Sequence, residues 1–593
     1  MLSQYTNINS QLDALRMKDI EKIFYKNMDK DVKVIPKVTP FKGISTDMLY
    51  IKDDRILFLK FMDTTEDLFL ILEEELLEVM NEEYELLRLK MSQNNKNISY
   101  NYVFVMPYVE IGDKYGFDDF VDKNIIDRKT LKDVIEDYTF IDKYLREENN
   151  EIELNLFLLS ICSEYYLFNN RLHLEKDFKK ISYLNDDYSY TATMLEKSQI
   201  KDVLSINYGN TLFNGGSATG KTTIMLSRAI KLSKIYPHHK FLVFTHTKQL
   251  CNELREHIKL LYKENNNLEI HTFSSFVFKL ARKYNLVVDY NMLKNDYEKA
   301  FANILKQADN VIKTKNMFKG IFIDEAESFL DYEIEFIREF LYKTKFVFNI
   351  YSCHALDISN NLNIFKPLFK EIEFDEIITL DKNYRQSEGL VEFINRFASN
   401  SNKYIKNLRP VINNDVFLKT RSIREGTNVV NMIKVSDLED QISSVIWELR
   451  YLMNEKGIDS SEIAIVYPYN KKRLKSGKTI YFQYMLRKAL DEANIAYICA
   501  EENLTNISKK TGTTIANIYT IKNLEYKAVI VCELEMLYNH TINNKEQDYQ
   551  VNDFVGDLNK VYLAINRATD YLSIITTFNE DASDIIRILK ESK

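Results

Sequence analysis

The chain has 593 residues and few that break or cross-link a backbone: five cysteines, seven prolines and fourteen glycines. The cysteines stand far apart and form no CxxC pair, so we expect neither a zinc ribbon nor a disulfide framework, and a reducing cytoplasm is favoured. The start lacks the apolar core of a signal peptide, and the most apolar run, "LNLFLLSICSEYYLF", is interrupted by a glutamate and too short to span a bilayer. No association with a membrane is expected.

Positive charge is not in excess either. The formal net charge is -8, with 45% hydrophobic and 28% charged residues, which is typical of a soluble globular protein rather than a disordered one. A length near 600 residues predicts three or four domains of about 150 residues each. The charge excludes a uniformly basic surface, but a local basic groove could still follow a phosphate backbone.

Glycine is scarce, yet three glycines fall within the stretch "FNGGSATGKTTIML". The preceding "GNTLFN" predicts a buried strand, and "KTTIMLSRAIKLSKIY" has the apolar spacing of a helix. In such a loop the backbone N–H groups surround a β-phosphate, the lysine reaches the β- and γ-phosphates and the threonine binds Mg²⁺. The alternative, a glycine turn before a solvated lysine, fits this context less well. The predicted ATP-binding loop consists of Gly215, Gly216, Ser217, Ala218, Thr219, Gly220, Lys221, Thr222 and Thr223.

A second acidic motif follows about a hundred positions after Lys221. In "GIFIDEAESFL" an apolar strand ends in Asp324 and Glu325. We expect Asp324 to hold Mg²⁺ through its water shell and Glu325 to orient and deprotonate the attacking water. Alone, this pair could equally be a polar loop; after a phosphate loop it is the expected second half of an ATP-hydrolysing site.

From about residue 195 onward the ordered motifs resemble those of the superfamily 1A helicases, the group of UvrD, Rep and PcrA. The similar segments are "LEKSQ", "LDKNYRQS", "EIAIVYPYN", "IYTIKNLEYKAVIV" and "VYLAINRATDYLSII". The resemblance implies that Gln199 and Tyr384 contact the adenine, that Glu525 contacts the ribose, and that Arg385 and Arg567 reach the γ-phosphate from a second lobe. For the two arginines, a surface salt bridge is the alternative.

Two further segments resemble the family's single-strand contacts. "FLVFTHTKQL" would place Thr245 and His246 on the strand, and "HTFSSF" would place Thr272 and Phe273 there. His246 stands where the family has an aromatic residue; it could stack weakly on a base, or be an ordinary loop histidine.

The sequence also departs from the family pattern. Glu327 replaces the Gln that usually follows the acidic pair, and "KFVFNIYSCHAL" replaces a strand ending in GDxxQ, with His354 near the Gln position. Tyr519 and Asn523 replace the His and Gly of another motif. The groups that hold ATP remain, whereas the coupling of hydrolysis to strand movement is open.

The first 125 residues have a different pattern. "ISTDMLYI" and "RILFLKF" alternate around "KDDR", which predicts a β-hairpin, and an acidic amphipathic helix and another strand follow. The order resembles, in outline, the NERD and restriction-endonuclease-like cores, with Asp47 and Lys60 at possible metal-nuclease positions. Phe58 stands where a metal-binding glutamate belongs, so a degenerate nuclease site or an ordinary hairpin is expected.

The predicted fold class is α/β, with two RecA-like P-loop NTPase domains preceded by a small αβ module and a helical connector. The expected boundaries are 1–125 for the module, 126–190 for the connector, 191–380 for the first motor domain with a small helical insertion at about 277–318, and 381–593 for the second with a reduced insertion. Small insertions predict weak or partner-dependent unwinding of duplex.

The expected function is ATP- and Mg²⁺-dependent movement along single-stranded DNA, 3′ to 5′ as the resemblance implies, at single strands or junctions, in DNA repair or phage defence. A protein partner could bind the N-terminal module. Three alternatives stay open: an ATPase that remodels a complex such as RNA polymerase, a nuclease-helicase fusion with a weak or inactive nuclease, and a slow nucleotide sensor.

Overall fold

The computed structural model describes residues 32–41, 44–94, 97–111, 119–169, 180–185, 188–261, 266–312, 317–353, 372–408, 410, 415–426, 430–468, 471–473, 479–500, 512–518, 520–521, 524–535, 537, 551–577 and 583–593. The chain divides into two compact units. The first comprises Met1–Ser205, Ser227–His239 and His257–Asn267, and the second comprises Ile206–Leu226, Lys240–Glu256 and Leu268–Lys593. Each unit is described by itself.

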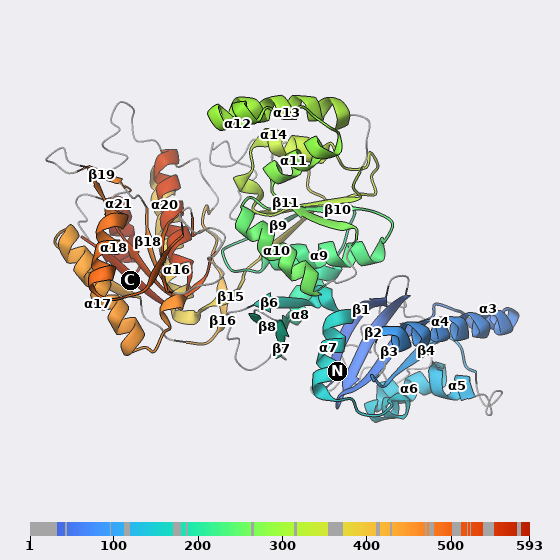
Figure 1. The fold of residues 1–593 in the computed structure, drawn as a ribbon. Coiled ribbons are helices and arrows are strands. Elements are labelled where there is room, and N and C mark those ends of the chain that lie inside the picture. Colours follow the sequence, from blue (N-terminus) through green and yellow to red (C-terminus); the bar gives the residue numbers. More distant parts are fainter. Residues whose placement is uncertain are drawn as a thin grey trace. The chain divides into compact units, whose positions relative to one another are not determined.

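The first unit is built on a five-stranded sheet in the order β1-β2-β3-β4-β5 (Figure 1). Strands β1 to β3 are antiparallel, and β3 to β5 are parallel. The predicted hairpin is confirmed: β2 and β3 meet at Asp53 and Asp54, which both have the positive φ of a tight turn. The bounds are β1 (Lys33–Phe41), β2 (Ile44–Lys52), β3 (Arg55–Phe61), α3 (Glu66–Ile71), α4 (Glu73–Asn94), β4 (Tyr100–Val105), α5 (Asp119–Asn124), β5 (Ile125–Ile126) and α6 (Arg128–Glu136).

The segment predicted as a helical connector is only partly helical. Its first part contains α6, η3 (Tyr138–Tyr144), α7 (Glu151–Ile161) and η4 (Ser163–Tyr165). The described residues of the remainder form a three-stranded antiparallel sheet of β6 (Tyr166–Asn169), β7 (Lys180–Asn185) and β8 (Tyr188–Met194), so the helical expectation is wrong for them. The reason is compositional, because "YSYTATM" consists largely of aromatic and β-branched residues that favour strands. Helix α8 (Lys197–Leu204) follows.

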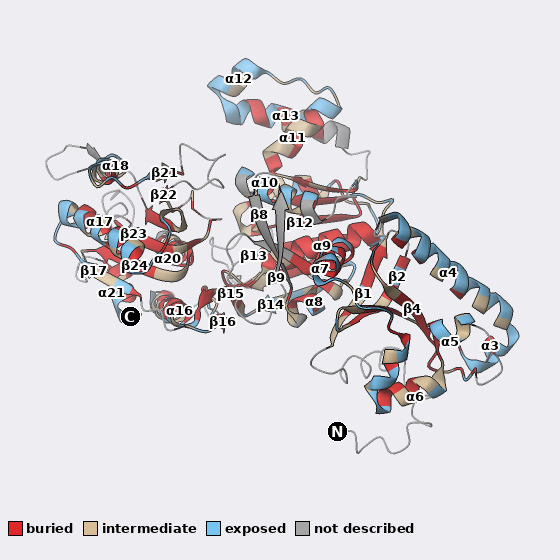
Figure 2. Cartoon of the chain, turned by 60° about the horizontal axis from the view of Figure 1, so that its bottom comes forward, coloured by how far each residue is buried: buried red, intermediate tan, exposed pale blue. Residues whose placement is uncertain are grey.

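The second unit contains a six-stranded parallel sheet in the order β11-β10-β12-β13-β9-β14. Three of its strands, β10, β12 and β13, consist of buried residues, as expected of a parallel sheet with helices on both faces (Figure 2). The strands are β9 (Gly209–Gly215), β10 (Phe241–Phe244), β11 (Leu268–His271), β12 (Gly320–Ile323), β13 (Phe348–Cys353) and β14 (Glu376–Leu380). The helices are α9 (Lys221–Ile235), α10 (Lys248–Leu261), α11 (Phe273–Lys283), α12 (Tyr290–Asn295), α13 (Tyr297–Ile312) and α14 (Asp331–Arg338), with η5 (Ala326–Ser328) after β12.

A second six-stranded parallel sheet has the order β17-β24-β23-β18-β22-β21. Its strands are β17 (Asn431–Lys434), β18 (Ile463–Tyr467), β21 (Tyr497–Cys499), β22 (Thr513–Asn517), β23 (Tyr526–Cys532) and β24 (Ala568–Thr576). Its helices are α16 (Glu388–Leu408), α17 (Leu438–Asn454), α18 (Phe482–Glu492), α20 (Val551–Ile565) and α21 (Asp584–Glu591), with η6 (Ser460–Glu462) before β18. Two small two-stranded sheets complete the unit, β15 (Lys382–Ser387) with β16 (Arg421–Arg424) and β19 (Lys471–Arg473) with β20 (Thr479–Tyr481).

The predicted fold class is confirmed: two RecA-like α/β domains and a small N-terminal αβ module. In the part of the chain that the structure describes, no helix combines the length and the apolar character needed to cross a bilayer.

Candidate active site

The glycine-rich segment connects strand β9 to helix α9, as the sequence predicts. Ala218 and Gly220 have φ values of 62° and 82°, so the chain turns through the left-handed region twice before the helix begins at Lys221. Gly216 is a glycine because a Cβ there would lie 2.7 Å from the Cγ2 of Thr420. Alternating backbone conformations of this kind aim successive N–H groups into a concave anion site, which fits a phosphate.

Lys221 is folded into this loop. Its Nζ donates hydrogen bonds to the carbonyl oxygens of Gly215, at 2.9 Å, and Gly216, at 2.6 Å. Burial lowers the pKa of Lys221 to about 8, although the nearby carboxylates of Glu327 and Asp324 act in the opposite direction. The side chain is therefore a buried cation within reach of any phosphate in the loop.

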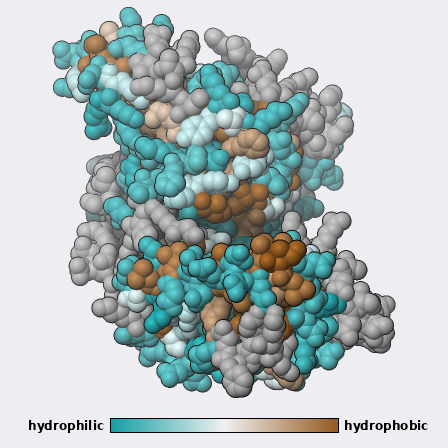
Figure 3. Space-filling model, turned by 90° about the vertical axis from the view of Figure 1, so that its right-hand side faces the viewer, coloured by the Kyte–Doolittle hydropathy of each residue, from teal (hydrophilic) through white to brown (hydrophobic). Residues whose placement is uncertain are grey.

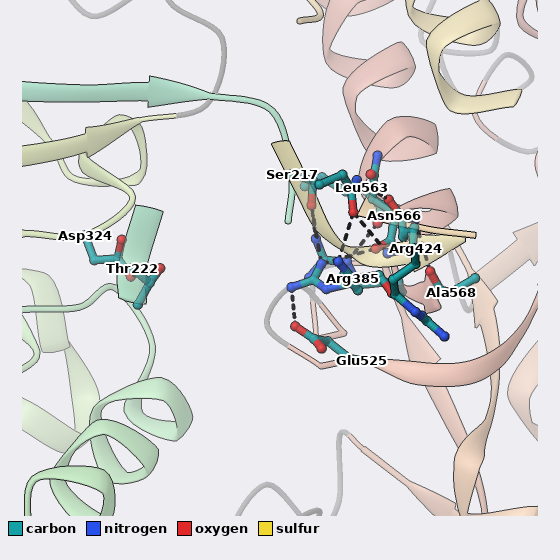
Figure 4. Close-up of polar contacts among 12 residues, drawn as sticks. Ser217, Thr222, Asp324, Arg385, Arg424, Glu525, Leu563, Asn566 and Ala568 are labelled. Atoms are coloured by element: carbon teal, nitrogen blue, oxygen red, sulfur yellow. Dashed lines mark hydrogen bonds and ion pairs between the residues drawn. The ribbon is translucent and has the colours of Figure 1, made fainter. Parts of the chain in front are cut away.

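Asp324 lies at the end of β12, beside the first turn of α9. Its carboxylate accepts hydrogen bonds from the hydroxyl of Thr222, at 2.8 Å, and from the hydroxyl of Ser352 (Figure 4 shows the Thr222 pair). Burial, and then the charge of Glu325, raise the pKa of Asp324 to about 6. A threonine hydroxyl and a carboxylate in contact are the protein groups expected around a phosphate-bound Mg²⁺, so the donor set fits that ion.

Ser352 was missed by the sequence reasoning. It lies near the end of β13, which is paired with β12, and its hydroxyl also accepts a hydrogen bond from the backbone N–H of Glu325 at 3.1 Å. The sequence singled out this altered strand end but directed attention to His354, which lies outside the described residues. Only the register between two strands identifies the serine, and no motif carries it.

The acidic loop after β12 has unusual geometry. Glu325 has a φ of 47°, a left-handed conformation that is uncommon for a residue with a side chain and clusters at functional sites. The charge of Glu327 acts on two neighbouring side chains. It opposes the lowering of the pKa of Lys221, and it adds to the effect of burial, which is the larger cause of the raised pKa of the Cys353 thiol. The residue at the family's Gln position is thus a carboxylate beside the phosphate loop.

Two arginines that lie far from the phosphate loop in the sequence converge on it. Arg385 in β15 and Arg567 after α20 each donate to the hydroxyl of Ser217 at 3.4 Å (Figure 4). Arg385 also forms an ion pair with Glu525. Burial, and then the charge of Arg385, lower the pKa of Arg567 to about 10, still far above neutrality. The structure therefore brings together Arg385, Arg567 and Glu525, three of the residues that the sequence assigned to the nucleotide.

A third arginine in this cluster carries no motif signal. The guanidinium of Arg424 in β16 donates to the backbone carbonyl of Arg385 (Figure 4 labels both residues). It also forms an ion pair with Asp570 at 2.8 Å. Arg424 is thereby tied to the strand that presents Arg385.

The two residues assigned to adenine, Tyr384 and Gln199, lie in different units and make different contacts. The backbone N–H of Tyr384 donates to the carbonyl of Ala218 at 3.0 Å, so it adjoins the phosphate loop. Gln199 lies in the first unit, where its side chain accepts the backbone N–H of Glu196 at 3.1 Å in a capping box of α8.

The segments compared with single-strand contacts lie after β10 and β11. His246 is exposed, with its ring edge-on to Phe329 at 5.9 Å, whereas Thr245 is buried. Thr272 caps helix α11. Phe273 is 5% exposed and packs against Phe301, Tyr332 and Phe336, so core packing accounts for this aromatic residue without a nucleic acid.

The residues compared with a nuclease site, Asp47 and Lys60, each contact a different partner. Asp47 accepts the backbone N–H of Phe61 at 2.8 Å and pairs with Lys37, whereas Lys60 pairs with Glu83 at 2.5 Å. Phe58 is fully buried. No group of three or more His, Cys, Asp or Glu among the described residues could hold a metal ion. The ordinary hairpin explains these residues as they stand.

A family model of known proteins matches the segment that holds the nucleotide site. Residues 195–471 match the UvrD/REP helicase N-terminal domain. A search of the curated proteins found no match. Among solved structures, the chain is similar to the C-terminal domain of a possible DNA helicase from Lactobacillus plantarum WCFS1, with 16% identity over 35% of this chain and 92% of that one, and a TM-score of 0.21, too low to support an argument. The family match covers the phosphate loop, the acidic pair and Arg385, so this segment is similar to the N-terminal domain of the UvrD/REP helicases.

Proposed function

We propose that the protein is an ATP-driven motor of superfamily 1A that moves 3′ to 5′ along single-stranded DNA. The observation that carries the proposal is the convergence of Arg385 and Arg567 on Ser217 of the phosphate loop. Groups from two RecA-like domains that meet at one phosphate site make the approach of the domains depend on ATP, and hydrolysis removes that dependence.

Each residue of the site has a role in this proposal. Lys221 and the loop N–H groups would hold the β- and γ-phosphates, and Glu325 would take a proton from the attacking water. Thr222 and Asp324 would hold Mg²⁺, which neutralises charge on the phosphate oxygens when it is bound. Charge that develops on the γ-phosphate would be stabilised by the two arginines.

The nucleic-acid contacts remain part of the proposal. Exposed His246, after β10, is the side chain best placed to meet a strand, and the backbone around Thr245 and Thr272 would contact phosphates. Buried Phe273 is not included. Gln199 and Tyr384 are retained as adenine contacts and Glu525 as the ribose contact.

Steady-state ATPase activity of the purified chain tests the proposal. It is measured alone and with single-stranded DNA, single-stranded RNA or duplex DNA, with Lys221→Ala as the blank. Stimulation of about tenfold or more by single-stranded DNA supports the motor. ATPase activity that is indifferent to nucleic acid would reject the motor and favour the remodelling of a protein complex.

A further inference from the structure

An apolar stripe lies exposed on the helices that follow the first hairpin. Its members belong to α3, to α4 and to the residue between these helices, and Figure 2 shows α4 as largely exposed beside buried strands. Such a set of large exposed apolar side chains on adjacent elements contributes little to the core of the unit and marks an interaction surface. The α4 stripe consists of Leu68 (43% exposed), Ile71 (75%), Leu72 (37%), Val79 (53%), Leu86 (44%) and Leu89 (53%).

The stripe is separate from the face that α4 buries. Met80, Leu87 and Met91 are fully buried, and they account for the packing of the helix on its own unit. Val79 and Leu86 are exposed and seven residues apart, so they lie along one line of α4, and Leu72 stands seven residues before Val79, just ahead of the first helical residue Glu73. An apolar line with seven-residue spacing, separate from the buried face, can form one edge of a seam with a partner helix.

The seam carries a specific charge. Glu75 and Glu82 are exposed and lie three residues after Leu72 and Val79, which places them at the alternate positions of the same seam. Residues 66–94 contain nine acidic and two basic side chains. The negative charge of this helix would repel a phosphate group. It would also repel a second copy of α4, because the seam glutamates of the two copies would face one another.

We propose that the α4 stripe docks an amphipathic helix of another protein, one with leucine or isoleucine opposite Leu72, Val79 and Leu86 and lysine or arginine opposite Glu75 and Glu82. Helix α4 has 22 residues, or about 33 Å at 1.5 Å per residue, which accommodates about three heptads. Figure 3 views the molecule from the right-hand side of Figure 1, where α3 and α4 lie. Brown apolar patches are visible there among hydrophilic side chains. The interaction is independent of the ATP site.

A synthetic helical peptide is the probe for this surface. It has three heptads, with leucine at one seam position and lysine at the other, and its binding to the full chain is followed by fluorescence anisotropy at physiological ionic strength. Replacing exposed residues of the stripe, in Val79→Lys with Leu86→Lys, should weaken binding about tenfold or more. The matched control is Val287→Lys with Tyr290→Lys, at residues 74% and 71% exposed, and it should bind like the unaltered protein.

Charge reversal separates recognition from misfolding. Glu75→Lys with Glu82→Lys should lose the lysine peptide and gain a peptide that carries glutamate at the same positions, which a damaged fold could not do. The proposal is overturned if the unaltered protein does not bind the lysine peptide or if the stripe variant binds it equally well. It is also overturned if sedimentation shows a dimer that the stripe variant loses, because the occupant would then be a second copy. ATPase activity should be the same in every variant, so failure here leaves the motor proposal standing.

Discussion

At the residue scale, two guanidinium groups contact the single hydroxyl of Ser217. Both would meet the γ-phosphate, where charge develops during hydrolysis. We predict that Arg385→Ala or Arg567→Ala lowers the turnover number about 10³-fold, while ATP binding changes only a few fold. Steady-state ATPase assays and the binding of a fluorescent ATP analogue measure the two effects separately.

The control for these variants is Arg450→Ala, because Arg450 is exposed on α17 and the motor proposal gives it no role. Its turnover should equal that of the unaltered protein. Turnover retained in either arginine variant at the site would show that hydrolysis does not need the second domain, and would remove the two-domain mechanism.

A buried carboxylate gives a prediction about stability. The pKa of Asp324 is raised to about 6 from an ordinary value near 3.8, so the folded protein binds this proton more readily than the unfolded chain. The cost to stability is absent below about pH 3.8, grows as the pH rises to about 6, and is complete above that. We predict that Asp324→Asn raises the free energy of unfolding of the nucleotide-free protein by about 1–2 kcal/mol at pH 7.5.

Urea denaturation in EDTA at pH 7.5 and pH 5 measures this effect. The gain should shrink at pH 5, and ATPase activity of Asp324→Asn should be lost throughout. A variant that is less stable at pH 7.5 would show that the hydrogen bonds from Thr222 and Ser352 outweigh the desolvation of the charge.

The sequence predicted those candidate site residues that belong to short, continuous motifs. Lys221 and Thr222 come with their glycine loop, and Asp324 comes at a strand end, so spacing alone places them. Ser352 and Arg424 join the site through strand pairing and through a contact with a backbone carbonyl. Pairing between distant segments leaves no local signal, which is why the sequence could not find them.

At the scale of elements, the small sheet of β15 and β16 presents Arg385. Arg424 holds the backbone carbonyl of Arg385 and is itself fixed by Asp570. We therefore expect Arg424 to act as a positioning residue, and predict that Arg424→Ala lowers the turnover number about tenfold with little change in KM. Arg424→Lys should not restore turnover, because lysine lacks the planar fork that spans both partners.

A double-variant cycle checks that Arg424 acts through Arg385. Arg385→Ala combined with Arg424→Ala should be no slower than Arg385→Ala alone. If the losses of turnover in the two single variants multiply in the double variant, Arg424 has a role independent of Arg385. If Arg424→Ala leaves the pH profile of turnover unchanged and lowers the melting temperature, its role is merely structural.

Helix α9 is anchored by a buried ion cluster within the first unit. Glu164 is fully buried in η4 and pairs with Lys234 at 2.6 Å and Lys231 at 3.5 Å. Burial opposes the charge, but the two lysines, Lys234 first, hold the pKa of Glu164 below its ordinary value. Its stabilisation is thus present at neutral pH and is lost as the pH falls through this lowered pKa.

Removing the carboxylate leaves two buried ammonium groups without their counterion. We predict that Glu164→Gln lowers the free energy of unfolding by about 3–5 kcal/mol at neutral pH, measured by urea denaturation. Glu153→Gln, at an exposed position in the first turn of α7, is the control and should change it by less than about 0.5 kcal/mol. Equal stability of both variants would show that the cluster is not a net stabilising feature.

Helices and strands were predicted correctly where the apolar residues kept a single helical or strand periodicity over many positions. The hairpin of β2 and β3 and the helix after β9 are strong signals of this kind. The prediction failed in the described residues between 166 and 190, where short strands pair with one another. Strands that depend on such partners show little amphipathic periodicity, and the neighbouring helices made a continuous helical connector the simpler prediction.

At the scale of the whole molecule, the described insertions in the RecA-like domains are small. About 45 residues separate β18 from β22, and their described part contains two short strands, the 11-residue helix α18 and β21. A large domain that grips duplex does not fit within 45 residues. The energy of ATP hydrolysis would then drive movement on a single strand more readily than the separation of long duplex.

We therefore predict 3′ to 5′ translocation with little unwinding by the protein alone. Streptavidin should be displaced at least about tenfold faster from a 5′-biotinylated than from a 3′-biotinylated oligonucleotide, because a motor of this polarity travels toward the 5′ end. A 3′-tailed duplex of several turns should remain paired in the same reactions, and Lys221→Ala should displace nothing. Faster displacement from the 3′ end would reverse the assigned polarity. Rapid opening of the duplex would instead show that the two RecA-like domains unwind without an insertion domain, and the structural reason for weak unwinding would be lost.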